Sequence, residues 1–243
     1  MNRGIKLLVV PFLVLFLFAG GAMALTLDGN MKDWNSAHYT DGEEYPYNNT
    51  GQVFPGWGGQ FFDVEKIGFF TDGTTAYFGL QTGFDFIDSD GFDYNGSTYF
   101  AGDIFIDFGQ DGVWEIAIDI SGGDLGDIYL VNDFTIPAYN TSAPYSVIGT
   151  DIGDVTSSAS ANYFNDINEQ TYGIEGSFDL STTLTSQMLD DLFSDGAIIH
   201  WTMSCGNDVL EHRAAPVPEP ATMLLLGIGL IGLAGVSRKK FNK

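Results

Sequence analysis

The chain has 243 residues and carries 32 Asp and Glu against 9 Lys and Arg, a formal net charge of −23. Apolar residues make up 44% and aromatic residues 14%, which is enough for a packed core and excludes global disorder. Residues 25–217 hold 31 of the acids and only three cations, and this charge of −28 excludes nucleic acid as a partner. The single cysteine, Cys205, excludes an internal disulfide and a cysteine-rich zinc site.

Residues 1–24 have the pattern of a secretory signal peptide. Arg3 and Lys6 precede the apolar stretch Leu7–Phe18, and Ala22-Met23-Ala24 supplies the small residues of a cleavage site. The apolar stretch is short for a membrane span, which favours a cleaved signal helix over an uncleaved N-terminal anchor. We therefore expect an exported protein.

The start of the mature chain resembles a known group of domains. In the segment 25–34, Asp28-Gly29, a short spacer and Asp33-Trp34 are similar to the opening of DOMON-like and family-nine carbohydrate-binding domains. The resemblance implies a β-sandwich, in families that bind sugars or haem and in some cases calcium. We expect Trp34 itself to lie in the core.

Three aromatic residues of the next segment are candidates for binding a glycan. Trp57 stands in a Gly- and Pro-rich loop, and Tyr45 and Tyr47 lie in a polar loop nearby. Exposed aromatic rings stack on the apolar faces of sugars. The alternative for Trp57 is that it closes one end of the sandwich.

Two hairpins follow from the alternation of apolar residues. An Asp72-Gly73 turn predicts a first hairpin between 66–71 and 74–80, and a loop at Gln110–Gly112 predicts a second between 103–108 and 113–120. The expected pairs are Ile67 with Phe78, Phe69 with Ala76 and Gly68 with Tyr77, then Ile104 with Ile118, Ile106 with Ile116, Phe108 with Trp114, Asp107 with Glu115 and Asp103 with Asp119.

The second hairpin thus gathers acids on one face, where like charges oppose each other and destabilise the sheet. Calcium prefers carboxylate oxygens and would remove this repulsion. The candidate ligands there are Asp103, Asp107, Asp111, Glu115 and Asp119. The alternative is a solvated outer face whose repulsion is screened by salt.

A second acidic loop contains Asp88, Asp90 and Asp93 at alternate spacing around a glycine. These carboxylates are further candidate calcium ligands, although the loop does not follow the order of an EF-hand. Calcium is the one cofactor that the sequence favours.

The segment 25–212 as a whole predicts one all-β domain, an antiparallel β-sandwich of the jelly-roll or Ig-like type. A short helix is expected at 185–193, with Leu189 and Phe193 on one face. His200 is interpreted as a hydrogen-bonded strand histidine and Cys205 as a small buried thiol, with a reactive or metal-binding thiol as the alternative.

Catalytic motifs are not apparent, and neither a nucleophile elbow nor a His-Glu-x-x-His motif occurs. We therefore expect a protein that is not an enzyme. The alternatives are a secreted hydrolase of surface polysaccharide, which needs two carboxylates in a cleft, and a purely structural matrix component.

The C-terminal segment consists of a linker, 213–220, and a region, 221–243, that predicts a single transmembrane helix and a basic tail. Ala221–Val236 is uncharged and about 24 Å long as a helix, which spans a membrane only marginally. The cluster Arg238, Lys239 and Lys240 predicts a cytoplasmic end.

Pro218-Glu219-Pro220, the apolar helix and the basic cluster resemble the PEP-CTERM sorting tail, also known as the ice-binding protein C-terminal domain. The resemblance implies export in a Gram-negative bacterium, an inner-membrane intermediate and cleavage by an exosortase-type membrane protease. It also implies delivery to the cell surface or an exopolysaccharide matrix. The sequence therefore predicts an exported surface protein, non-catalytic, that binds glycan with calcium support.

Overall fold

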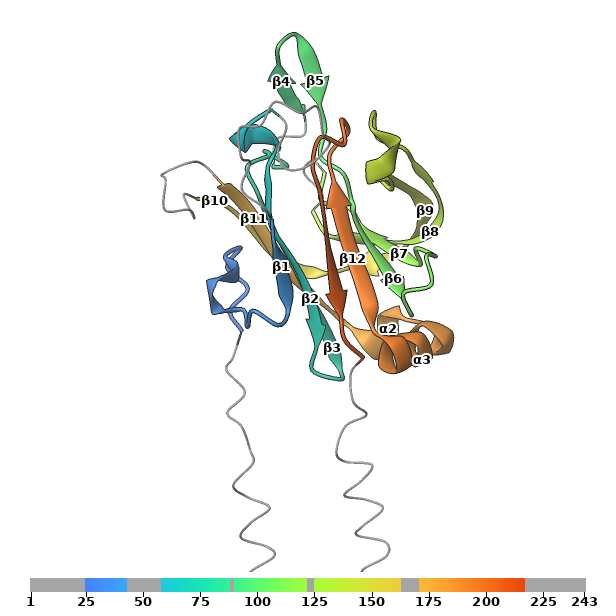
Figure 1. Ribbon diagram of the computed structural model, residues 1–243. Helices are drawn as coiled ribbons and strands as arrows, with labels where there is room; N and C mark the ends of the chain where they lie inside the picture. The colour runs from blue at the N-terminus through green and yellow to red at the C-terminus, as the bar shows by residue number, and fades with distance from the viewer. Residues whose placement is uncertain (1–24, 43–57, 88–89, 122–124, 163–170, 217–243) are drawn as a thin grey trace, which may run out of the picture.

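The computed structural model describes residues 25–42, 58–87, 90–121, 125–162 and 171–216, and all structural statements concern these residues. Two antiparallel sheets pack face to face, which confirms the predicted all-β fold (Figure 1). In spatial order, the first sheet contains β1 (Tyr39–Asp41), β2 (Val64–Thr71), β3 (Thr75–Thr82), β11 (Thr171–Asp179) and β10 (Thr156–Asn162). The second contains β13 (Val209–Ala214), β12 (Ala197–Thr202), β6 (Ile104–Phe108), β7 (Ile116–Ile118), β8 (Asp127–Thr135) and β9 (Ser146–Asp154).

Short elements complete the body. A separate hairpin is formed by β4 (Phe92–Tyr94) and β5 (Ser97–Tyr99). The helical elements are η2 (Met31–Asp33), η3 (Gln60–Phe62), η4 (Asn140–Ser142), α2 (Leu180–Thr183) and α3 (Ser186–Asp195). The core lies between the two sheets, where β2 and β3 contribute Phe69 and Phe78 and the second sheet contributes Ile106, Ile116 and Trp201, all at most 1% exposed.

The second hairpin has the predicted register over its strands. Ile104 pairs with Ile118 and Ile106 with Ile116. The predicted pairing of Phe108 with Trp114 is wrong, because the ladder ends at Ile106 and a wider loop follows. The Trp114 ring instead contacts Phe105 on the outer face of the sheet, with the ring centroids 6.1 Å apart.

The first hairpin has the predicted faces but different partners. Ile67 pairs with Leu80, Phe69 with Phe78 and Gly68 with Gly79, two residues away from the predicted partners. The cause lies in the turn, because the Asp72 N–H donates to the carbonyl of Thr75 and leaves Gly73 and Thr74 as its central residues. Gly73 has a φ of +94°, and the Asp72 carboxylate accepts from the N–H groups of Thr74 and Thr75.

Gly68 and Gly79 leave space for the side chain of Met31 because glycine has no Cβ atom. A Cβ atom at either position would lie within about 3 Å of the Met31 side chain, which is only 1% exposed. The two facing glycines therefore make room for η2 on the outer face of the first sheet, where the N-terminal segment packs.

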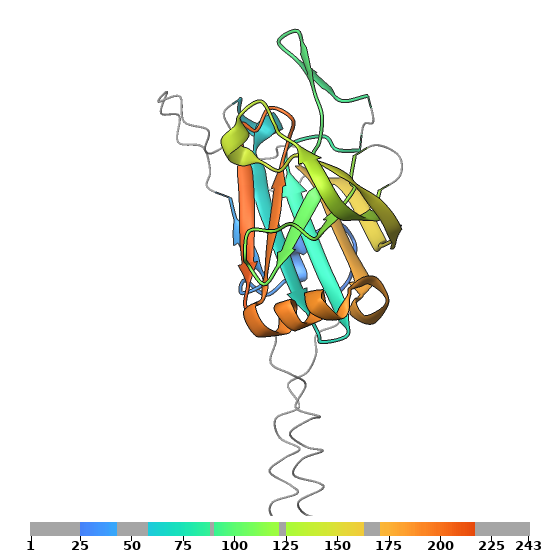
Figure 2. The same cartoon turned by 90° about the vertical axis from the view of Figure 1, so that its right-hand side faces the viewer.

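The outer face of the second sheet is covered over β6, β7 and β12, whose residues are buried on both faces. The ribbon of β8 and β9 bends across it (Figure 2), and Phe134 of this ribbon packs on Phe105. The start of β9 bonds to Asp103, the residue before β6: the N–H of Asp103 donates to the Tyr145 carbonyl, and its carboxylate accepts from the N–H of Val147. Asp103 is consequently 3% exposed. Asp107, whose carboxylate accepts from N–H groups of the following loop, is 1% exposed, so the alternative of a solvated acidic face is wrong for these two residues.

The predicted helix at 185–193 is present as α3. Thr185 caps it by accepting from the N–H of Met188. Leu189 and Phe193 share one face as predicted and pack half-buried against the core, while Met188 and Leu192 are the fully buried side chains. β13 continues two residues past the expected end of the body at 212.

Leu25 and Pro216, the first and last residues of the described body, lie at the same end of the sandwich as α2, α3 and the β2–β3 turn (Figures 1 and 2). We refer to this end as the base. The predicted signal peptide and transmembrane helix lie outside the described residues. Within the described ranges, no helix is both long enough and apolar enough to cross a membrane.

Candidate functional site

The loop between β6 and β7 is shaped by residues with positive φ. Gly109, Gln110 and Gly112 have φ values of +90°, +57° and +88°. The loop is also fastened to the base, because the Gln110 side-chain amide donates to the carbonyls of Asp195 and Ala214. These contacts fix the loop next to the end of α3 and the end of β13.

Three carboxylates meet in this loop. Ligand oxygens of Asp107, Asp111 and Glu115 all lie within 4.8 Å of one another. Asp107 is buried, Asp111 exposed and Glu115 half-buried, so the cluster runs from the sheet to the solvent. The structure therefore brings together three of the five candidate ligands of the second hairpin.

Each carboxylate of this group, which we call the acidic triad, also accepts a backbone N–H. Asp107 accepts from Asp111 and Gly112, at 3.2 and 2.9 Å, and Glu115 accepts from Phe108 at 2.8 Å. Asp111 accepts from Val113 at 2.9 Å. The three side chains are thus held in place by the loop, and an added cation would meet preoriented oxygens.

The triad is electrostatically unfavourable without a cation. Burial raises the pKa of Glu115 to about 7, with a further contribution from the charges of Asp107 and Asp111. Burial also raises the pKa of Asp107. A divalent cation at this position would compensate both the lost solvation and the repulsion.

The other two candidate ligands of this hairpin form a separate pair. Burial raises the pKa of Asp103 to about 7, and the charge of Asp119 adds to the shift. Among the described residues, neither of them belongs to a group of three potential metal ligands.

The remaining candidates are dispersed or lie outside the described residues. Asp88, Trp57, Tyr45 and Tyr47 are outside the described residues. Asp90 and Asp93 are exposed, and the Asp93 carboxylate accepts from the Thr98 hydroxyl across the β4–β5 hairpin. The described part of the chain contains no three-ligand group that includes either of them.

His200 and Cys205 have the expected environments. His200 is 1% exposed, with Nε2 2.9 Å from the Pro144 carbonyl and Nδ1 3.3 Å from Glu211. Cys205 is buried, and burial raises the pKa of its thiol, which disfavours the reactive thiolate.

Glu175 is a central residue that sequence reasoning missed. Its side chain is fully buried on the outer face of the first sheet, and Oε2 accepts from the N–H groups of Asp28, Gly29 and Asn30 at 2.8–3.0 Å. Oε1 accepts from the indole N–H of Trp34, which is 6% exposed as predicted. Asp28, Gly29 and Trp34 of the opening segment thus all donate to one carboxylate. The only signal for this in the sequence is the spacing of the opening segment, which does not identify Glu175.

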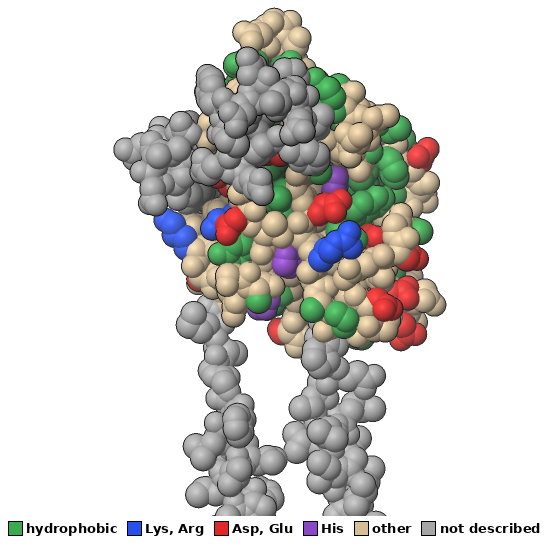
Figure 3. Space-filling model, viewed as in Figure 1, with side chains coloured by type: hydrophobic (Ala, Val, Ile, Leu, Met, Phe, Trp, Pro, Cys, Tyr) green, Lys and Arg blue, Asp and Glu red, His purple; other side chains and the backbone are tan. Residues whose placement is uncertain are grey.

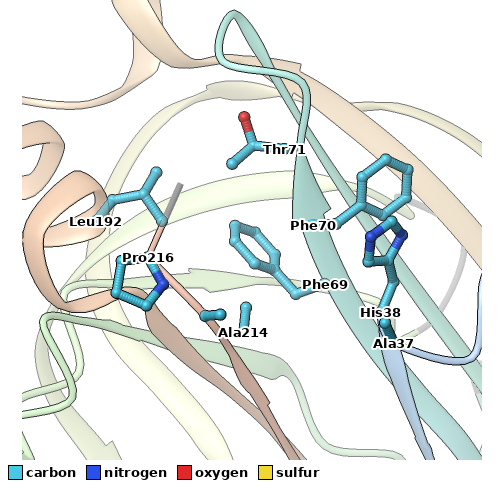
Figure 4. Close-up of a pocket in the computed structure, with 9 residues that line it drawn as sticks. Ala37, His38, Phe69, Phe70, Thr71, Leu192, Ala214 and Pro216 are labelled. Atoms are coloured by element: carbon cyan, nitrogen blue, oxygen red, sulfur yellow. The ribbon is translucent and has the colours of Figure 1, made fainter. Parts of the chain in front are cut away.

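Two adjoining hollows lie at the base. The first, about 270 Å³, is lined mostly by apolar side chains and contains Phe69, Leu192 and the residues Ala214–Pro216 (Figure 4). The second, about 440 Å³, is lined by residues of the opening segment from Leu25 onwards. His38 and Phe70, whose rings are stacked with centroids 4.4 Å apart, line both hollows.

The fold and the site together define the class of protein. It is an acidic antiparallel β-sandwich in which the loop between β6 and β7 holds three carboxylates close to the end of β13. The comparisons add a sorting signal, because residues 216–239 match the model described as the PEP-CTERM protein-sorting motif. The predicted sorting residues from Pro218 to Lys239 lie within the match, and Lys240 follows it directly. Neither the curated proteins nor the solved structures gave a match to the chain.

The motif establishes the export, processing and sorting of the chain. It identifies an exported protein that is processed by an exosortase, a membrane protein, and sorted toward the cell surface. The matched region begins at Pro216, the residue at which the described body ends.

Proposed function

We propose that this chain is a non-catalytic protein of the cell surface or extracellular matrix of a Gram-negative bacterium, whose body binds calcium at the acidic triad. The observation that carries the calcium site is the meeting of Asp107, Asp111 and Glu115 within 4.8 Å in one loop. Calcium takes six to eight oxygens, so backbone carbonyls and water complete the coordination. Extracellular calcium sites bind at roughly 0.1–1 mM, which suits a protein outside the cytoplasm.

Calcium is expected to stabilise the exported protein. After chelation, 5 mM calcium should raise the free energy of unfolding by roughly 2 kcal/mol, because the ion binds only the folded loop. For a body of this size this corresponds to roughly 5 °C in melting temperature. Differential scanning calorimetry in EDTA and in calcium measures the shift. The shift should be smaller at pH 6 than at pH 8, because Glu115, with its pKa near 7, holds a proton at the lower pH.

The test variant is Asp111→Asn, and Asp93→Asn is its matched control. Asp111 is exposed, and an asparagine Oδ1 can still accept from the N–H of Val113, so the variant should fold normally. It should lose most of the calcium shift, whereas Asp93→Asn on the β4–β5 hairpin should keep it. A wild-type melting temperature unchanged by calcium would remove the calcium part of the proposal.

Glycan binding is the second part of the proposal, with exopolysaccharide as the partner. One support is the sorting of the chain toward the surface. The other is the opening segment, which resembles carbohydrate-binding domains and whose Asp28, Gly29 and Trp34 are held together by hydrogen bonds to Glu175. The relation to DOMON-like and family-nine carbohydrate-binding domains stays a hypothesis. A glycan array probed with wild type and with Trp57→Ala tests it, and equal signals would exclude Trp57 as the stacking residue.

A secreted polysaccharide hydrolase is the alternative class, and the raised pKa values of Asp103 and Glu115 are the observation in its favour. Burial argues against it, because carboxylates that are 3% and 1% exposed, as in Asp103 and Asp107, cannot contact a sugar ring. Release of reducing sugar by wild type but not by Glu115→Gln would support the hydrolase.

A further inference from the structure

The base is the part of the body nearest to the membrane while the chain is being sorted. Four residues, 217–220, separate Pro216 from the uncharged segment Ala221–Val236. Because an extended chain covers at most about 3.5 Å per residue, the five steps from Pro216 to Ala221 span roughly 17 Å. As long as the apolar segment occupies the bilayer, the base must therefore lie within this distance of it.

The first hollow opens at this end and has the character of a docking site. Phe69, Phe70 and Leu192 give it apolar walls, and Pro216 forms part of its rim, directly before the sorting motif (Figure 4). α3, which supplies Leu192, also carries exposed acids, and acidic side chains gather over this helix in Figure 3. The base thus combines an apolar recess with an acidic border on its α3 side, and the exposed cation Arg213 lies next to the lining residue Ala214.

We propose that this recess docks the outward face of the membrane-embedded sorting protease, which inserts an apolar side chain flanked by cationic ones. The proposal rests on the sorting of the chain by the PEP-CTERM motif. A protein is favoured over the lipid surface because the exposed acids of α3, Asp190 and Asp195, are repelled by anionic headgroups, and because a concave recess fits a protruding side chain. Docking beside Pro216 would hold residues 217–220 at the protease and raise their effective concentration there.

Filling the recess should slow removal of the tail. Ala37 lines the recess and is exposed, so Ala37→Trp fills it without disturbing the core. In cells that contain the sorting protease, pulse-chase labelling followed by mass measurement gives the rate of tail removal from the full-length chain. We expect a roughly tenfold slower rate for Ala37→Trp, against less than twofold for Ser36→Trp, an exposed neighbour that does not line the recess.

The acidic border provides a second, independent measurement. Asp190→Asn with Asp195→Asn should slow processing several-fold, whereas Asp133→Asn with Asp154→Asn, exposed acids on β8 and β9, should not. Equal rates for the two tryptophan variants would overturn the docking proposal. Faster processing after loss of the α3 acids would also overturn it, since the base would then face lipid. A wild-type chain that keeps its tail would contradict sorting itself, and the calcium shift can be measured regardless of any of these results.

Discussion

Replacing Glu175 by leucine is expected to lower the free energy of unfolding by roughly 4 kcal/mol. The side chain is fully buried and accepts four hydrogen bonds, from three backbone N–H groups of residues 28–30 and from the indole of Trp34. Leucine fills a similar volume but leaves these donors unsatisfied, and each unsatisfied buried donor costs about 1–3 kcal/mol. Burying the carboxylate is itself unfavourable and raises its pKa, but the four donors outweigh this cost.

Urea unfolding followed by tryptophan fluorescence measures the loss. Glu175→Gln should lose only about half as much, because an amide oxygen can keep the three backbone bonds while its NH₂ group faces the Trp34 donor. Asp133→Asn, an exposed acid on β8, should stay within about 0.5 kcal/mol of wild type. A leucine variant as stable as this control would show that the opening segment contributes nothing to the fold.

Replacing Asp103 by asparagine is expected to stabilise the protein at alkaline pH and not at acidic pH. Burial raises the pKa of Asp103 to about 7, and Asp119 raises it further. In the folded state the group therefore binds its proton more tightly than in the unfolded chain, where its pKa is near 4. Its contribution to stability is present at low pH and is lost as the pH rises through 7.

The asparagine variant has no proton to lose, so it avoids that cost. Relative to wild type, its free energy of unfolding should be roughly 2 kcal/mol more favourable at pH 8 than at pH 5, after allowance for partial solvent screening. Asparagine Oδ1 can still accept from the N–H of Val147. Urea titrations at both pH values, in EDTA, give this difference.

The comparison with wild type removes the contribution of His212 to the pH dependence of stability, which has the opposite sign to that of Asp103. Burial lowers the pKa of His212 to about 4, so the unfolded chain binds more protons between pH 4 and 6.5 and stability rises with pH over that range. Both proteins retain His212, and its effect cancels in the difference. An Asp103→Asn variant with the same advantage at pH 5 and pH 8 would contradict a raised pKa at this position.

Local patterns predicted the all-β class and two hairpins, but not the order of the strands in the two sheets. Strict alternation around Ile104 and Ile116 predicted both the face and the register of β6 with β7, although the loop between the strands is wider than the three residues expected. The sequence left two possible registers for the first hairpin. Either Asp72-Gly73 or Gly73-Thr74 can form a two-residue turn, and the structure has the second, with the Asp72 carboxylate accepting from the N–H groups of Thr74 and Thr75.

The candidate site was only partly accessible to sequence reasoning. Asp107, Asp111 and Glu115 are eight residues apart at most, and the hairpin alone brings them together. The burial of Asp103 depends on Tyr145 and Val147 at the start of β9, the second of them 44 residues away in sequence, which no periodicity of the hairpin reveals. Glu175 lies 141 residues from Trp34, so its role required the strand order of the first sheet.

The position of both ends of the body at the base has a practical consequence. The β4–β5 hairpin projects from the opposite end (Figure 1), so a peptide inserted at Asn95-Gly96 in its turn would point away from the membrane as long as the tail is in place. Because these residues are exposed and only two short strands flank them, an epitope or an affinity tag placed there should leave the sandwich intact. The body therefore offers a ready scaffold for surface display.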